Sequence, residues 1–275
     1  MTQSVSTAVR TRNLVAAYAH QSVMIENNTL PISASHEMHE ELAGSFFQDV
    51  NLASLPLRQL AKTPLPRLAS FRPGQDNGDA ESMELRNHIV ASECIAQTAG
   101  SRAHGGSGLS TSNRGFDEHQ VRALSALAMA GLDPRGLYPW AIGPRLRLGQ
   151  YRQTPIGVKS NPMAVFPYHT WRCRHTEKLH PLILACHAMV YFLLIHPFVD
   201  GNGRVSRMIV QDDLMRQGYL PPYLVDLDRG EYLTMIRSAA DGNPSLLVDR
   251  VVHAQLDSLQ STVLGDTAAG ALERT

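Results

Sequence analysis

The longest apolar stretch of the chain runs from Leu182 to Ile195 and is interrupted only by His187. A helix that spans a membrane needs about 20 apolar residues, so this shorter stretch predicts a buried core helix. A glycine-rich turn over His196–Gly203 follows directly, and a second helix is expected from about Arg204 to Gln217, where Gly218 ends it. The chain should therefore fold around two successive helices joined by a tight turn.

The remaining sequence patterns are mostly helical. Short alternating runs and turn residues between Gly149 and His169 are typical of a β-hairpin. Pro64–Asp79 reads as a loop, and Ala99–Gly115, which is rich in Gly and Ser, reads as a flexible inserted loop. The prediction is an all-α fold with one hairpin, with further helices at Asn13–Thr29, Ser33–Val50, Ala80–Gln97, Phe116–Gly131, Gly230–Ala240 and Pro244–Leu264.

These patterns suggest four parts: an N-terminal segment over residues 1–32, a helical part over 33–115 that ends in the flexible loop at 99–115, a core over 116–264 and a tail over 265–275. The 25 basic residues balance the 25 acidic ones, so no overall field favours nucleic acid or a membrane surface. The N-terminus lacks the apolar stretch of a signal peptide, although its Arg, Ser and Thr content leaves a transit peptide open. We expect a cytoplasmic or nuclear protein without a transmembrane segment.

The segment HPFVDGNGRVSR, His196–Arg207, combines residue types that suit phosphate chemistry. The turn Gly201-Asn202-Gly203 can present backbone N–H groups at the start of a helix, where unpaired donors and the helix dipole favour an anion. Arg204 and Arg207 are three residues apart on the following helix, so both are expected to reach phosphate oxygens.

Two further side chains of this segment can carry the reaction itself. Asp200 is the nearest carboxylate, and Mg²⁺ commonly takes one or two carboxylates together with the phosphates of its substrate. His196 lies at the mouth of the turn, and an imidazole with a pKa near neutrality can remove a proton from an attacking hydroxyl group. We expect His196 as the general base and Asp200 as the metal ligand.

These twelve residues resemble the signature of the Fic (filamentation induced by cAMP) family, His-x-Phe-x-Asp/Glu-Gly-Asn-Gly-Arg-x-x-Arg, at every specified position. The segments LGQYR, LHPLILACHAMVYFLLIHPF and QGYLPPYLVDLDRGEYLTMIRSA are similar to stretches of the eukaryotic adenylyltransferases of this family. The resemblance implies a helical bundle in which a central helix-loop-helix carries the active site, with the hairpin as a flap.

The resemblance also implies an activity, in which AMP is transferred from ATP with Mg²⁺ to a Ser, Thr or Tyr hydroxyl of a target protein. In the family, Phe198 packs inward to anchor the loop, and the flap at Tyr151–Phe166 docks the target segment. Tyr232 and Ile236 match positions of the adenine pocket, whereas Ala240 stands where relatives often have Asn. Fic relatives are often dimers, so a homodimer is one expected assembly.

A second motif lies upstream, where Ser22-Val-Met-Ile-Glu26-Asn27 fits the inhibitory pattern Ser/Thr-x-x-x-Glu-Gly/Asn of the family. Ser22 and Glu26 are four residues apart and share a helix face. The resemblance implies that Glu26 pairs with Arg207 and so disfavours the productive pose of ATP. In some relatives the same glutamate orients water that removes AMP from a modified protein.

Other interpretations remain beside the adenylyltransferase. One is a hydrolase in which Glu26 serves AMP removal as the main activity, and another is a nucleotide-binding interaction protein without catalysis. HEMHE, His36–Glu40, has its two histidines three apart, which differs from the His-Glu-x-x-His spacing of zinc hydrolases, and we expect a solvated helix face there.

Overall fold

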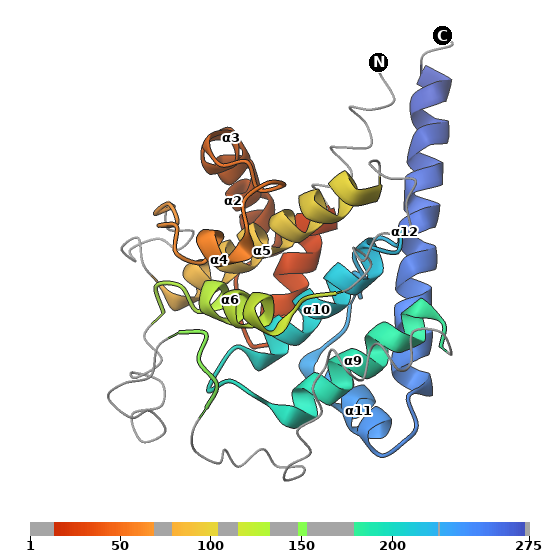
Figure 1. The fold of residues 1–275 in the computed structure, drawn as a ribbon. Helices are drawn as coiled ribbons and strands as arrows, with labels where there is room; N and C mark the ends of the chain where they lie inside the picture. Colours follow the sequence, from red (N-terminus) through yellow and green to blue (C-terminus); the bar gives the residue numbers. More distant parts are fainter. Residues whose placement is uncertain are drawn as a thin grey trace.

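The protein is known from a computed structural model that describes residues 14–68, 79–103, 115–132, 148–152, 179–224 and 226–272. Within these ranges the chain is helical and contains no strand, which confirms the all-α prediction (Figure 1). A helix over residues 14–24 comes first. The following helices are α2 (Ile32–Gly44), α3 (Phe46–Asp49), α4 (Leu57–Leu60), α5 (Ala80–Ala103), α6 (Glu118–Ala128), α9 (Pro181–Ile195), α10 (Asn202–Met215), α11 (Arg229–Ala240) and α12 (Ser245–Leu272).

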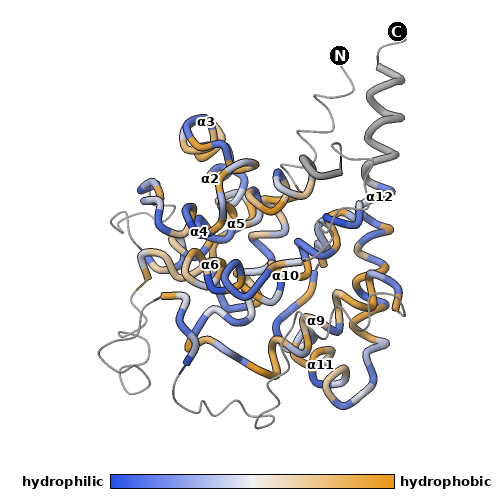
Figure 2. Tube along the Cα trace, viewed as in Figure 1, coloured by the Kyte–Doolittle hydropathy of each residue, from blue (hydrophilic) through white to orange (hydrophobic). Residues whose placement is uncertain are grey.

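Helices α9 and α10 form the central pair that the sequence predicts. α9 begins with Pro181 at its first position, where a missing N–H costs nothing, and His180 Nδ1 accepts from the Leu182 N–H at 3.4 Å. Most of α9 is coloured as hydrophobic in Figure 2, and its apolar side chains are largely buried. α10 packs against α9, α5 and α6, so the loop between α9 and α10 is fixed from several sides.

The helix over residues 14–24 belongs to the core of the protein. Val15, Ala19 and Val23 are at most 1% exposed, and Tyr18 is 3% exposed. One hydrophobic cluster joins this helix to α2, α5, α6, α9 and α10. Side-chain packing therefore crosses the expected boundaries between residues 32 and 33 and between residues 115 and 116.

One predicted helix start is confirmed by local hydrogen bonds, and one predicted helix is broken. Asp117 caps α6 in a capping box, because it accepts from the Gln120 N–H at 2.7 Å while the Gln120 side chain accepts from the Asp117 N–H at 2.9 Å. The helix expected over Ser33–Val50 is wrong as a single element. It breaks at Ser45, whose φ of −133° and ψ of −89° are not helical, and continues as the short α3.

Two helices continue beyond their predicted ends. α5 runs to Ala103, so the predicted start of the loop at Ala99 is wrong. A helix that has already formed extends through residues of moderate helix propensity. α12 runs to Leu272 and takes in most of the expected tail at 265–275. Residues 104–114 and the hairpin from residue 153 onward lie outside the described residues.

The HEMHE segment corrects another expectation, since it is not a fully solvated helix face. His39 is 4% exposed, and its Nε2 lies 3.1 Å from Oε2 of Glu93 on α5. The segment thus uses one histidine to join α2 to α5, while Glu37 and Glu40 are exposed. No group of three or more potential metal ligands exists among the described residues.

In the described part of the chain, no helix combines the length and the apolar character that crossing a membrane requires.

Candidate active site

The loop between α9 and α10 is closed by the side chain of Asn202. Its Oδ1 accepts from the Phe198 N–H at 2.9 Å, and its Nδ2 donates to the Phe198 carbonyl at 2.8 Å. Gly201 turns the chain into α10 with a φ of 75°, a left-handed conformation that glycine adopts without strain. Phe198 is 2% exposed and packs on Phe192 and Tyr151, which confirms its inward orientation.

His196 ends α9 in the left-handed conformation, with a φ of 48° and a ψ of 58°. Its Nδ1 lies 3.2 Å from the carbonyl oxygen of Leu193. Because a carbonyl oxygen only accepts, Nδ1 carries the proton and Nε2 keeps its lone pair. Burial lowers the pKa of His196, the hydrogen bond to Leu193 opposes this shift, and the charge of Arg152 adds to it. Neutral His196 is therefore favoured at pH 7, as a general base requires.

Arg152 anchors the chain next to His196. Its Nε donates to the His196 carbonyl at 2.7 Å, one of its terminal nitrogens donates to Ile195 at 3.2 Å, and its backbone N–H donates to Pro197 at 2.9 Å. These contacts satisfy carbonyl groups that the end of α9 leaves without helical partners. Arg152 thus joins the residues leading into the expected flap to the loop of the motif.

Asp200 is the carboxylate of the motif loop. Its Oδ1 accepts from the Gly201 N–H at 2.6 Å, which orients the carboxylate at the start of α10. It is partly exposed, and it belongs to no group of three or more potential metal ligands among the described residues. A single carboxylate fits Mg²⁺ that is held mainly by phosphate oxygens.

The first turn of α10 is occupied on its outer side by Glu26. A Cβ atom at Gly203 would overlap the carboxylate oxygen Oε1 of Glu26 and would lie 3.3 Å from Nη1 of Arg207. The absence of a side chain at Gly203 therefore lets a carboxylate approach the N-terminus of the helix, where its charge is favoured. In this structure the Glu26 carboxylate therefore lies against the first turn of α10.

Arg207 is 5% exposed and faces the helix over residues 14–24. Its Nε donates to Oγ of Ser22 at 2.6 Å, and its Nη2 donates to the Ser22 carbonyl at 2.6 Å and to Oε1 of Glu26 at 2.8 Å. Tyr18 donates its hydroxyl hydrogen bond to the Arg207 carbonyl at 2.5 Å. The structure thus brings Ser22, Glu26 and Arg207 together.

Glu26 is held by a second arginine as well. Its Oε2 lies 3.1 Å from Nη1 of Arg229, and the same nitrogen donates to the Ile25 carbonyl at 2.6 Å. Burial alone would raise the pKa of Glu26, but the charges and hydrogen bonds of Arg207 and Arg229 outweigh it and lower the pKa. Glu26 is accordingly an ionised carboxylate at neutral pH.

Arg204 does not point in the direction that the sequence suggests. It is 2% exposed and donates to the Ala128 carbonyl at 3.1 Å, and its Nη1 lies 3.4 Å from Oε1 of Glu84. One terminal nitrogen lies 3.7 Å from the position that a Cβ of Gly201 would take. Arg204 therefore supports the loop from below and is buried beneath the surface where an anion would bind.

Tyr232 is buried in the same region. It is 2% exposed, its ring centroid lies 5.4 Å from the Arg207 guanidinium carbon, and its hydroxyl lies 3.6 Å from Sδ of Met189. Ile236 is 9% exposed, whereas Ala240 lies at the exposed end of α11. With residues 14–24 in place, Tyr232 packs behind Arg207 and offers no open face to a base.

Sequence reasoning assigned no role to three charged residues of the site, which are Glu84, Arg152 and Arg229. Burial raises the pKa of Glu84, although the charge of Arg204 opposes this. Glu84 also lies 3.5 Å from Nδ2 of Asn28, so it links the motif loop to the chain that follows Glu26. The sequence places Arg229 just after Asp228, the N-cap of α11. This position does not predict a contact with Glu26.

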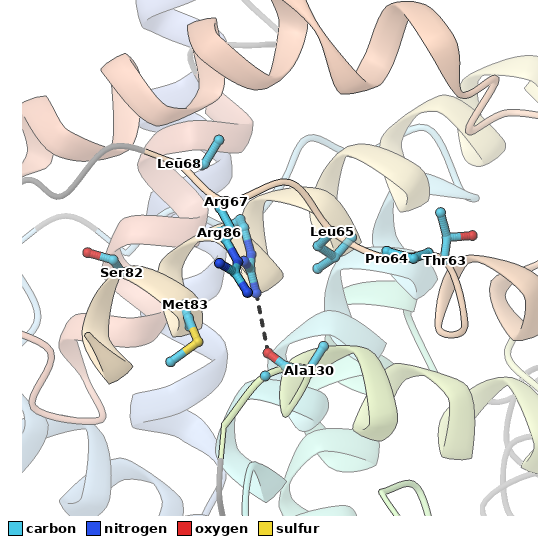
Figure 3. A pocket seen from close by; sticks show the side chains of 10 residues that line it. Thr63, Pro64, Leu65, Arg67, Leu68, Ser82, Met83, Arg86 and Ala130 are labelled. Atoms are coloured by element: carbon cyan, nitrogen blue, oxygen red, sulfur yellow. Dashed lines mark hydrogen bonds between the residues drawn. The ribbon is translucent and has the colours of Figure 1, made fainter. Parts of the chain in front are cut away.

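A separate cavity of about 560 Å³ lies where α5 meets the end of α6 (Figure 3). Arg86 crosses its wall and is already engaged, because it donates to the Pro66 carbonyl at 3.0 Å and to the Ala130 carbonyl at 3.3 Å. None of the residues that line it belongs to the segment His196–Arg207. The cavity is thus distinct from the candidate active site.

Comparison with known proteins also singles out the part of the chain that contains His196–Arg207. Residues 115–212 match the model of the Fic/DOC family. A protein adenylyltransferase Fic of Drosophila melanogaster is 41% identical over 90 residues, which cover 32% of this chain and 18% of the relative. That of Drosophila persimilis is 39% identical over 90 residues, with the same coverage. The chain thus aligns with less than a fifth of the length of these curated relatives.

Solved structures extend the likeness of the fold to nearly the whole chain. Fic-1 (residues 134–508) of C. elegans superposes with a TM-score of 0.60 at 18% identity, covering 92% of this chain and 64% of that one. A Fic domain containing signaling protein of Bacteroides thetaiotaomicron gives a TM-score of 0.57 at 20% identity, covering 97% of this chain and 91% of that one. Residues 115–212, which include the motif loop between α9 and α10, thus match the Fic/DOC family model, and the fold of the chain resembles that of solved Fic structures.

Proposed function

We propose that this protein is an adenylyltransferase that moves AMP from ATP to a Ser, Thr or Tyr hydroxyl of a target protein. The observation that carries the proposal is the position of His196, with a free Nε2, beside a helix N-terminus that already accommodates an anion. The names of the curated relatives and the match to the Fic/DOC family support the same activity.

In the proposed reaction His196 Nε2 takes the proton of the target hydroxyl while the hydroxyl oxygen attacks the α-phosphorus of ATP. A new P–O bond to the target forms, and the bond between the α-phosphorus and the bridging oxygen breaks with its electron pair. Pyrophosphate then leaves. Mg²⁺, when bound at Asp200, would offset negative charge on the phosphates.

The other motif residues position this chemistry in different ways. The backbone N–H groups of Gly201, Asn202 and Gly203 are suited to bind phosphate, while the Asn202 side chain keeps the loop closed. Arg207 would bind phosphate once Glu26 has left it, and Arg204 would support the loop from within the protein. Tyr232, which is buried behind Arg207, would support the adenine site from within the protein.

We also propose that Glu26, with Ser22, restrains the enzyme. The carboxylate occupies the anion position at the start of α10 and engages Arg207, so ATP has to displace it to bind productively. The target protein is proposed to dock along residues 151–166, of which Tyr151 and Arg152 are held next to the loop. We likewise propose a homodimer and a cytoplasmic or nuclear location for this protein.

The test is incorporation of label from α-³²P-ATP with Mg²⁺ into the protein and into a lysate. Glu26→Gly should raise labelling above wild type, and Glu26→Gly/His196→Ala should abolish it. If Glu26→Gly still binds ATP but labels neither itself nor the lysate, the transferase proposal is wrong under these conditions. A folded state for each variant is checked by its melting temperature.

One observation favours a second candidate, the hydrolytic removal of AMP. The charge of Glu26 raises the pKa of His196 slightly against the effect of burial, so the two groups lie within electrostatic range of each other. Such a carboxylate can orient a water molecule towards the phosphorus of an AMP–protein bond. A modified target that loses AMP faster with wild type than with Glu26→Gly would favour this activity.

A further inference from the structure

The carboxylate of Glu26 lies between two guanidinium groups from different helices. Arg207 of α10 contacts Oε1 at 2.8 Å, and Arg229 of α11 contacts Oε2 at 3.1 Å. The carboxylate also sits against Gly203 in the first turn of α10, where backbone N–H groups lack helical partners. Both oxygens of one anion are therefore matched by cationic donors that converge on a single point.

One donor at this position is not used by the carboxylate of Glu26. Nη1 of Arg207 is buried, has no hydrogen-bond partner in the described part of the protein, and lies 3.3 Å from the Cβ position of Gly203. A buried unpaired donor on a charged group is costly, and an anion with a third oxygen would satisfy it. A terminal phosphate group has three such oxygens, whereas Glu26 has two.

Arg229 is also positioned independently of Glu26. Its Nη1 donates to the Ile25 carbonyl at 2.6 Å, and Asp228 caps the helix directly before it by accepting from the Glu231 N–H at 2.9 Å. The main chain around Ile25 is fixed by its own buried packing. When the side chain of Glu26 rotates away, Arg229 therefore stays at the edge of the vacated position.

We propose that Arg229 is a second arginine for the terminal phosphate of a nucleoside triphosphate, beside Arg207. This inference rests on the proposed function and adds a binding residue outside the motif. Glu26 then competes with the terminal phosphate for two cations, and the site gains a means to prefer triphosphates over diphosphates. Arg229 lies at the start of α11, the helix that also carries Tyr232, so the nucleoside and its terminal phosphate would contact the same helix.

The test measures nucleotide binding by calorimetry with Mg²⁺, so it requires no transfer reaction. It compares Glu26→Gly with Glu26→Gly/Arg229→Ala for ATP, ADP and AMP. Loss of one charge-assisted contact to the terminal phosphate should weaken ATP about tenfold or more and leave AMP within about twofold. The matched control is Glu26→Gly/Arg237→Ala, since Arg237 is an exposed arginine on the same helix, and it should bind ATP like Glu26→Gly.

Each outcome has a distinct meaning. Equal ATP affinity with and without Arg229 would show that Arg229 contacts only Glu26 and would overturn the inference. An equal loss for all three nucleotides would also overturn it, because the effect would not concern the terminal phosphate. If Glu26→Gly binds none of the three, the proposed function fails and the inference fails with it. Glu26→Gly/Arg229→Lys, which keeps the charge, should bind ATP with an affinity between those of Glu26→Gly and Glu26→Gly/Arg229→Ala.

Discussion

Neutralising Glu26 without changing its size isolates the competition at the anion position. Glu26→Gln keeps the volume and one oxygen but removes the charge that both arginines contact. The hydrogen bond from buried Arg207 contributes roughly 2 kcal/mol, at the level expected for a charged pair. The contact with Arg229, whose side chain is 41% exposed, contributes about 0.5 kcal/mol after allowance for solvent screening.

If ATP has to break these contacts, their loss should appear as a gain in ATP affinity. A sum of roughly 2 to 3 kcal/mol corresponds to a dissociation constant about 30- to 150-fold lower for Glu26→Gln than for wild type. Calorimetric titration with ATP and Mg²⁺ measures this difference directly. Glu231→Gln, an equivalent change at an exposed position of α11, is the control and should leave the constant unchanged.

The result that refutes this reasoning is an ATP dissociation constant that agrees within twofold between wild type and Glu26→Gln. Glu26 would then lie beside the nucleotide position without competing for it. Melting temperatures should be measured for both variants, because loss of the ion pairs also removes part of their contribution to the folded state.

Three further predictions concern the loop between α9 and α10, the half-buried His196 and the buried His88. Asn202→Ala removes both hydrogen bonds to Phe198 and should lower the free energy of unfolding by about 2 to 3 kcal/mol in urea titrations. A loss below about 0.5 kcal/mol would show that these two hydrogen bonds do not stabilise the loop. Because the pKa of His196 is lowered, the acid limb of the transfer rate should have its midpoint below pH 6.5, and a midpoint above 7 would argue against His196 as the base. Burial, with the charges of Arg207 and Arg204, holds the pKa of His88 well below 6.5, so below that pH the unfolded chain binds a proton that the folded chain does not. Stability should fall there by up to about 1.4 kcal/mol per pH unit, and His88→Phe should flatten this slope; an unchanged slope would contradict the assignment.

The motif loop between α9 and α10 could be predicted from the sequence because its geometry is encoded locally. Gly201 and Asn202 shape a turn within a few residues of His196, and the spacing of the motif carries this information directly. The pairing of Glu26 with Arg207 was expected from the resemblance to the family, and the structure brings the two residues together at 2.8 Å. The helix over residues 14–24 contacts α10 through Tyr18 and Ser22, and no local pattern contains these contacts.

The direction of Arg204 could not be predicted for a physical reason. Spacing on a helix shows that Arg204 and Arg207 are neighbours, but what lies opposite each one depends on the packing of other helices. Glu84 and the Ala128 carbonyl hold Arg204 below the loop, and both come from segments remote in sequence. Arg229 escaped prediction likewise, as a single charged residue whose partner is set by tertiary packing.

The burial of residues 14–24 has a genetic consequence. Val15, Tyr18, Ala19 and Val23 are almost fully buried, and covering each larger apolar side chain contributes about 1.5 to 3 kcal/mol to folding. A deletion that removes this helix would therefore expose the core along with the anion position. Truncated alleles should yield unstable protein, and under the proposed restraint a hyperactive allele should arise through a missense change at a residue such as Glu26 or Ser22.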